Sequence, residues 1–286
     1  MLSLRERLSA LRAGILTTAH IRKRGFFIPY AYAGSRDDQI TRYEALMPCF
    51  EAAGNRFESM LDAIEACLER LRRFGSGPLD PKWSGRMYPP RDGATAYAMV
   101  CRHRPRRIIE IGSGSSTHFM ARAVRDCDIE CEITCIDPAP RSDISALGVN
   151  HIARVLAVDD LALVERLEPD DILFIDSSHI MLPGMDVDIE FNCFFPVLAP
   201  GVLVHVHDIF LPYRYPTSWA IREWSEQNSL IGWIHSSYFE LLFAGYYASL
   251  NHAESWSRIA AAFAPLADPS AGSLWLRRPA KSDGLH

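Results

Sequence analysis

The stretch RIIEIGSGSST, residues 107–117, decides the fold class of this chain. Its β-branched first part predicts a short buried strand, and Gly112 and Gly114 predict a tight turn into a helix over 116–126. Strands that alternate with helices form a parallel sheet covered on both faces, so the fold class is α/β. The other predicted elements are strands at 132–136, 154–157, 171–175 and 202–206, a helix at 188–197, and an edge strand pair at 239–247 and 273–277.

The first 90 residues predict a helical extension. A helical stripe runs through Leu61, Ile64, Leu68 and Leu71, and a linker rich in glycine and proline follows at 75–90. We therefore divide the chain into an N-terminal helical cap, 1–90, and a main domain, 91–286. The aromatic run FFIPYAYAG, residues 26–34, would close over a site or mediate self-association, which would give a homo-oligomer through the N-terminal helices.

The first helical stretch is basic and amphipathic. The first 25 residues hold six Lys or Arg and one Glu, and Leu4, Leu8, Leu11 and Ile15 share one face. We expect a helix docked on the rest of the protein. A transit peptide and a helix lying at a membrane surface are the alternatives.

Composition excludes several classes of protein. The 286 residues are 48% hydrophobic and 23% charged, which is typical of globular domains, and a net charge of −5 argues against nucleic acid as a partner. The seven cysteines are scattered and odd in number, which favours a reducing cytoplasm over a disulfide framework. No apolar run approaches twenty residues, so we expect no membrane span.

Polar residues follow each predicted strand, at the edge where α/β sheets bind their ligands. The strand ends read Ile111-Gly112-Ser113-Gly114, Ile136-Asp137-Pro138, Val158-Asp159-Asp160, Asp176-Ser177-Ser178-His179 and His205-Val206-His207-Asp208. Glycines let a backbone approach a ligand closely, and a carboxylate accepts hydrogen bonds from ribose hydroxyls. Together these strand ends predict a nucleotide-type site.

The pattern Glu110-x-Gly112-x-Gly114-x-Ser116, with Asp137 at the end of the next strand, resembles the class I S-adenosylmethionine-dependent methyltransferases. The resemblance implies that residues from about 93 to 280 form the Rossmann-like sheet of these enzymes, and that the helical extension precedes it. It implies that Gly112 to Gly114 contact the methionyl part, Asp137 the ribose, and Val158 and Asp159 the adenine. The implied cofactor-binding residues are Glu110, Gly112, Ser113, Gly114, Ser116, Thr117, Asp137, Pro138, Asp159, Asp176 and Ser177.

Longer runs resemble a bacterial subgroup of these enzymes, methyltransferase family 24. The runs are LFIDSSH at 173–179 and GVLVHVHDIFLPYRYP at 201–216, together with the aromatic run and SLWLRR at 273–278. A dinucleotide-binding domain is disfavoured, because Thr117 stands where that fingerprint has a third glycine or alanine.

Two neighbouring strand ends bring together Asp176, His179, His207 and Asp208. Asp176, His207 and Asp208 would hold a divalent metal, and a histidine among the ligands favours a softer ion than Mg²⁺. Alternatively His179 or His207 acts as a general base. A third interpretation is that these groups only hydrogen-bond loops. The catalytic candidates are His179, His207 and Asp208. An aromatic patch, Tyr213, Tyr215, Trp219 and Trp224, would line an acceptor pocket, although core packing explains Trp224 equally well.

We therefore predict an enzyme that transfers a methyl group from S-adenosylmethionine to an oxygen or nitrogen of a small-molecule acceptor. One alternative is a metal-assisted, hydroxylase-like enzyme on the same scaffold. The other is a non-catalytic protein that binds S-adenosylmethionine.

Overall fold

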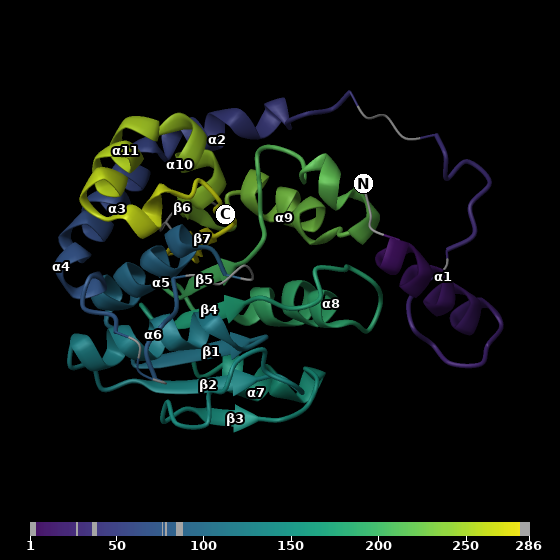
Figure 1. The fold of residues 1–286 in the computed structure, drawn as a ribbon, viewed down its shortest axis with the longest axis horizontal. Helices are drawn as coiled ribbons and strands as arrows, with labels where there is room; N and C mark the ends of the chain where they lie inside the picture. Colours follow the sequence, from purple (N-terminus) through teal and green to yellow (C-terminus); the bar gives the residue numbers. More distant parts are fainter. Residues whose placement is uncertain are drawn as a thin grey trace.

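The computed structural model describes residues 4–26, 28–35, 39–75, 77, 79–83 and 88–280, without the side chains of residues 6, 7 and 221. Its centre is a seven-stranded sheet in the order β3-β2-β1-β4-β5-β7-β6 (Figure 1). The first five strands pair in parallel, and β7 runs antiparallel between β5 and β6. The predicted fold class is confirmed. The strands are β1 (Arg107–Ile111), β2 (Glu132–Ile136), β3 (Asn150–Ile152), β4 (Ile172–Ile175), β5 (Leu203–Val206), β6 (Glu240–Ala244) and β7 (Leu274–Arg277).

The third strand differs from its prediction at 154–157. β3 ends at Ile152, and the apolar residues that follow form a loop. Asp160 causes the turn, because its carboxylate pairs with Arg154 at 2.7 Å and accepts the Ala157 amide at 2.9 Å. These contacts bend the chain into the short helix η2 (Val158–Asp160).

Helices cover both faces of the sheet. From the centre of the sheet, the crossover through α6 (Ser115–Asp126) leads one way to β2, and the crossover through α8 (Asp186–Ile189) leads the other way to β5. Right-handed crossovers in opposite directions place these helices on opposite faces. The predicted helix at 188–197 is formed by α8 with η3 (Glu190–Phe194) and η4 (Phe195–Val197). The other helices here are α5 (Pro90–His103), which packs on α6, and α7 (Leu161–Val164).

Part of the N-terminal extension belongs to the core. The predicted stripe of Leu61, Ile64, Leu68 and Leu71 is buried, and α3 packs against both α5 and β6. The extension contains α1 (Leu4–Thr18), η1 (Glu44–Leu46), α2 (Met47–Ala52), α3 (Gly54–Ala66) and α4 (Leu68–Leu71). The C-terminal part adds η5 (Thr217–Arg222), α9 (Glu226–His235), α10 (Gly245–Asn251), α11 (Ala253–Ala262) and η6 (Ala264–Ala267).

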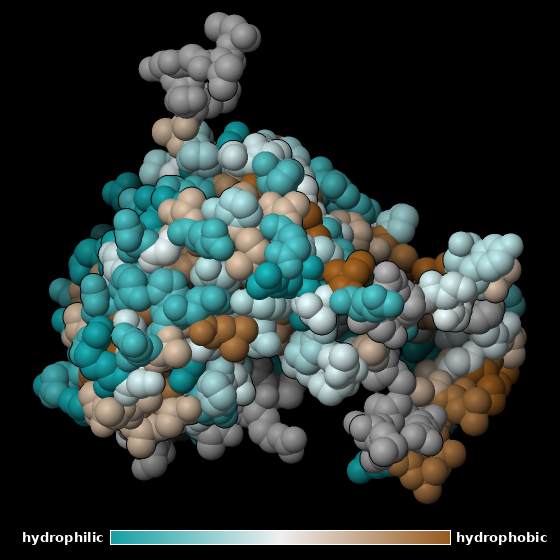
Figure 2. Space-filling model, turned by 90° about the horizontal axis from the view of Figure 1, so that it is seen from above, coloured by the Kyte–Doolittle hydropathy of each residue, from teal (hydrophilic) through white to brown (hydrophobic). Residues whose placement is uncertain are grey.

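The first helix stands at the side of the molecule with its apolar face uncovered (Figures 1 and 2). Leu4, Leu8, Leu11 and Ile15 are 55–73% exposed, so the expected docking of α1 on the protein is wrong. In the aromatic run Tyr30 and Tyr32 are also exposed, and Phe27 lies outside the described residues. Residues 76, 78 and 84–87 of the expected linker lie outside them too. The domain boundary, the closure over a site and the self-association stay predictions.

The structure contains one disulfide, whereas the scattered cysteines predicted none. Cys101 near the end of α5 is joined to Cys127 just after α6. The two half-cystines are 26 residues apart in the sequence and meet only because α5 and α6 pack side by side. Cys131 and Cys135 are free, and Cys135 is buried in β2 as expected. Across the described residues, no helix combines the length and the apolar character needed to cross a membrane.

Candidate active site

The carboxyl ends of four parallel strands surround a cavity of about 430 Å³, which we name the donor cavity. Gly112 and Ser113 follow β1, Asp137 and Pro138 follow β2, and Asp176 with Ser177 follows β4. Six of the predicted cofactor-binding residues therefore meet in one place. The remaining walls come from Ile111, Ile136, Ala139, Arg141, Val155, Leu156, Gly184, Met185 and Asp186.

The turn after β1 requires glycine at its first position. Gly112 has φ +80°, and a Cβ atom there would lie 1.9 Å from the carbonyl oxygen of Asp176. The next residue, Ser113, donates its backbone N–H to Asp137 Oδ2 at 2.7 Å. The Ala139 amide donates to the other oxygen of the same carboxylate at 2.6 Å. Two amides thus fix the Asp137 carboxylate at the cavity wall, and each oxygen keeps a lone pair for a ligand hydroxyl.

One polar atom of this wall is left without a partner. Ser113 Oγ is buried and makes no hydrogen bond within the described structure. A buried hydroxyl without a partner costs free energy, and this atom has almost no surface open to the cavity.

Glu110 supports the turn from behind the cavity. It has no exposed surface, and it accepts hydrogen bonds from Ser116 Oγ and Thr117 Oγ1, both at 2.6 Å. Thr117 Oγ1 in turn accepts the Gly114 amide at 3.0 Å. Burial raises the pKa of Glu110 to about 7. These four predicted cofactor residues hold the turn and do not line the donor cavity.

Asp159 also lies away from the donor cavity. It is exposed in η2, and Val155 and Leu156 form the wall that the resemblance assigned to the neighbourhood of Asp159. The displacement follows from the early end of β3. Sequence reasoning missed Arg141 and Met185, which carry no strand-end signal. Asp186 also lines the donor cavity, and its carboxylate accepts the Ser178 amide at 3.0 Å.

A second cavity of about 560 Å³ adjoins the first, and we name it the acceptor cavity. Asp176, His179 and Asp208 form its acidic side. Phe210, Trp219, Trp224 and Tyr246 supply its aromatic walls, and Arg141 and Arg222 line it as well. Two residues, Arg141 and Asp176, line both cavities. Of the predicted aromatic patch, Trp219 and Trp224 lie here.

Three side chains form a group compatible with a metal ion. Ligand atoms of Asp176, His179 and Asp208 all lie within 4.8 Å of one another. His179 Nε2 is 3.5 Å from Asp176 Oδ1 and 3.7 Å from Asp208 Oδ2. Its other ring nitrogen, Nδ1, is 2.7 Å from the buried carboxylate of Glu226. A carboxylate behind a histidine fixes the ring and its tautomer, as it does in many metal sites.

His207 lies next to the same two acids but is buried. It is 1% exposed, its Nε2 lies 3.3 Å from Asp92 Oδ2, and it does not line the acceptor cavity. Its Nδ1 is 3.6 Å from both Asp176 Oδ1 and Asp208 Oδ1 and has no hydrogen-bond partner. The metal-compatible group contains His179, and His207 as a metal ligand stays a prediction. His205 is fully buried and stacks on Phe174 at 3.7 Å.

The acids and histidines shift one another's pKa values. Burial alone would raise the pKa of Asp176, but His207 and His179 outweigh it and hold this pKa well below its usual range. Burial would lower the pKa of His179, whereas its hydrogen bonds to Asp176 and Glu226 raise it to about 10. Burial raises the pKa of Asp208 despite both histidines.

Two residues of the group have strained backbones. His179 has φ +64° and Asp208 has φ +56°, a region that residues with a side chain rarely adopt. The His179 carbonyl accepts the Ser225 amide at 3.0 Å and the Glu226 amide at 3.2 Å, which holds the strained loop. Such strain is common at functional sites, where it directs a side chain.

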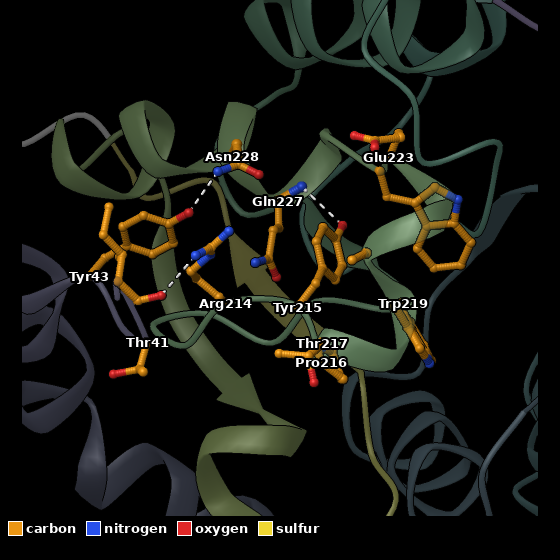
Figure 3. A pocket seen from close by; sticks show the side chains of 13 residues that line it. Thr41, Tyr43, Arg214, Tyr215, Pro216, Thr217, Trp219, Glu223, Gln227 and Asn228 are labelled. Atoms are coloured by element: carbon orange, nitrogen blue, oxygen red, sulfur yellow. Dashed lines mark hydrogen bonds between the residues drawn. The ribbon is translucent and has the colours of Figure 1, made fainter. Parts of the chain in front are cut away.

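A side pocket lies next to the acceptor cavity (Figure 3). Trp219 and Trp224 line both spaces. In the side pocket Asn228 donates to the Tyr43 hydroxyl at 2.7 Å, and Arg214 donates to the Ile40 carbonyl at 3.0 Å. The segment before η1 is thereby tied to the loop after β5 and to α9, so the N-terminal extension lines the side pocket.

Several solved structures resemble this chain. CmcI-N160 with SAH is 16% identical over 68% of this chain and 79% of that chain, with a TM-score of 0.40. The O-methyltransferase TomG from Streptomyces achromogenes, in complex with SAM, is 16% identical over 85% of this chain and 93% of that chain, with a TM-score of 0.39. The SAH-bound Podospora anserina methyltransferase PaMTH1 is 15% identical over 90% of this chain and 100% of that chain, with a TM-score of 0.35. No curated protein matches the chain.

A family match covers the strand ends that form both cavities. Residues 109–209 match Methyltransf_24, a methyltransferase domain. This is the subgroup that the runs at 173–179 and 201–216 resemble, and its range extends from β1 to the residue after Asp208. Residues 109–209 are therefore similar to a methyltransferase domain, and they contain the ends of β1, β2 and β4 that line the donor cavity.

Proposed function

We propose that this protein transfers the methyl group of S-adenosylmethionine to a hydroxyl oxygen of a small molecule. The observation that carries the proposal is the junction of the two cavities, which share Asp176 and Arg141. A donor in one cavity and an acceptor in the other would meet at this junction. Methyl transfer needs little more than such positioning, because the sulfonium of the donor is already activated.

The donor cavity suits S-adenosylmethionine. Asp137 presents a fixed carboxylate to the ribose hydroxyls, and Leu156 offers an apolar surface to the base. The turn of Gly112 and Ser113 lines the cavity where the methionyl part would pass. Gly112, Ser113, Asp137, Pro138, Asp176 and Ser177 are the binding residues that we propose.

The transfer balances with the groups at the junction. The acceptor oxygen forms a bond to the methyl carbon as the sulfur–carbon bond breaks, and the bonding pair passes to sulfur, which becomes a neutral thioether. The hydroxyl proton passes to Asp208, which lines the acceptor cavity. Burial raises the pKa of that carboxyl, so its carboxylate accepts a proton better than an exposed one does. Asp176 faces both substrates and fixes their approach.

A divalent cation fits the same group. Asp176, His179 and Asp208 offer two carboxylates and one imidazole, and Glu226 holds the imidazole with Nε2 toward the acids. This mixed oxygen and nitrogen set favours Mn²⁺, Fe²⁺ or Zn²⁺ over Mg²⁺. When bound, such an ion supplies a positive charge that favours the ionised form of an acceptor hydroxyl.

Calorimetric titration of the full chain with S-adenosylmethionine and S-adenosylhomocysteine tests the proposal. The titration is run first in EDTA and then with Mn²⁺ or Zn²⁺. We expect micromolar binding, lost in Asp137→Asn and kept in Asp159→Asn, because only Asp137 lines the donor cavity. Equal affinity in the wild type and Asp137→Asn would refute the donor assignment.

Turnover separates the remaining functions. Binding of the donor without methyl transfer to any hydroxyl or amine would favour a non-catalytic binding protein. Metal-dependent consumption of an acceptor without a methylated product would favour the hydroxylase-like alternative. Transfer to amines alone would replace oxygen by nitrogen as the acceptor atom.

A further inference from the structure

Two arginines line the acceptor cavity without an anionic partner. Neither Arg141 nor Arg222 forms an ion pair with any residue that the structure describes. Arg141 faces the donor cavity as well, whereas Arg222 lines the acceptor cavity alone. A guanidinium with five donors and no acidic partner in a ligand cavity is suited to a carboxylate of the ligand.

The position of Arg222 is fixed by stacking. It is the last residue of η5, and its guanidinium carbon lies 4.2 Å from the Trp219 ring and 4.5 Å from the Trp224 ring. Contact with two indoles restricts the side chain before a ligand binds, which lowers the entropy cost of an ion pair.

One indole connects Arg222 to the acidic side of the cavity. The Trp224 ring also contacts the His179 ring, with centroids 4.1 Å apart. The guanidinium and the group of Asp176, His179 and Asp208 therefore lie within the reach of one aromatic ring. The other aromatic rings that line this cavity contact one another, because Phe210 packs against Trp219 at 5.1 Å and against Tyr246 at 4.8 Å. Rigid aromatic walls favour a flat ligand.

We infer that the acceptor is an aromatic hydroxy acid, with its hydroxyl toward Asp208 and its carboxylate toward Arg222. The inference rests on the proposed function, because it uses the same cavity. The charges also fix the orientation. A carboxylate turned toward Asp176 and Asp208 would be repelled, so the ring binds with the carboxylate at the distal end.

The test uses the full chain saturated with S-adenosylhomocysteine, so that binding is measured without turnover. The probes are 4-hydroxybenzoate and its neutral isostere 4-hydroxybenzamide, titrated calorimetrically. A charge-assisted pair contributes enough for the acid to bind about ten- to a hundred-fold more tightly than the amide. Arg222→Gln should abolish this preference, and Arg222→Lys should restore only part of it, because lysine lacks the planar fork.

Arg258→Gln is the matched control. Arg258 lies in α11, pairs with Glu65 at 3.0 Å and lines neither cavity, so the preference should persist in this variant. Equal binding of acid and amide to the wild type would overturn the inference, as would a preference that survives in Arg222→Gln. Absence of binding by both probes to protein that does bind S-adenosylhomocysteine would also overturn it, and would leave the donor assignment intact. Failure to bind S-adenosylhomocysteine would instead refute the proposed function.

Discussion

The donor and acceptor cavities share Asp176, yet they are built by different means. The donor cavity is lined mainly by residues that follow the parallel strands, and its shape depends on backbone, above all on Gly112. The acceptor cavity consists of side chains from segments as distant as 89, 141, 179, 222, 246 and 272. Backbone at strand ends suits a ligand that never changes. Side chains on connecting segments can be exchanged without altering the sheet, so we expect acceptor specificity to depend on them.

The largest effect should come from the acceptor side of the junction. Asp208→Asn removes the proposed proton acceptor, so turnover should fall by about a hundred- to ten-thousand-fold. Donor affinity should change little, because Asp208 does not line the donor cavity. Single-turnover assays with calorimetry on the same variant separate the two effects. An equal loss of turnover and donor affinity would show that the two cavities are not independent.

The backbone of the donor cavity gives the next effect. Gly112→Ala places a Cβ atom at φ +80° against the Asp176 carbonyl, so the turn must move. We expect donor affinity to fall by about a hundred-fold, since strain of this kind costs about 3 kcal/mol. Gly148→Ala, also at a positive φ but with open space around it, is the control. Unchanged donor affinity in Gly112→Ala would contradict a cavity shaped by this backbone.

Substitution of Glu226, which holds His179 at the acceptor cavity, should have a smaller effect. Glu226→Gln weakens the hold on His179 Nδ1, so Mn²⁺ affinity should fall by about ten- to a hundred-fold. Electron paramagnetic resonance counts free Mn²⁺ directly and needs no turnover. Glu254→Gln, in the first turn of α11, should leave the affinity unchanged. If both variants bind Mn²⁺ like the wild type, Glu226 does not position a metal ligand.

The smallest effect concerns Glu110, which supports the turn behind the donor cavity, and it appears in the free energy of unfolding. Burial raises the pKa of Glu110 to about 7, so the folded state binds the proton more tightly than the unfolded state does. The free energy of unfolding should therefore lose about 2 kcal/mol between pH 5 and pH 7 through this group. Urea denaturation at several pH values measures the loss.

Glu110→Gln should flatten that pH dependence, because glutamine does not ionise. Glu130→Gln, at an exposed position, should leave the dependence as in the wild type. A dependence that persists in Glu110→Gln would mean that other groups cause it.

Local patterns predicted the sheet because each depends on a few adjacent residues. The strand β1, the turn at Gly112 and the helix α6 follow from residue size and backbone freedom within 107–126. The third strand was misplaced because Asp160, five residues past the start of the apolar run, bends the chain by pairing with Arg154. The pattern of apolar residues along the chain does not predict such an ion pair.

The sequence by itself determined the α/β sheet, the glycine turn, Asp137 at the donor cavity and the membership of Asp176 and Asp208 in one group. These features follow from the order of the strands in the sequence, because the carboxyl ends of parallel strands lie at the same edge of the sheet. Only the tertiary structure decided that His179 lines the acceptor cavity while His207 does not, that Glu110 lies behind the turn, and that Trp224 contacts both Arg222 and His179. Each depends on the direction of a side chain and on partners such as Glu226 and Asp92, which are distant in the sequence and meet only in the packed core.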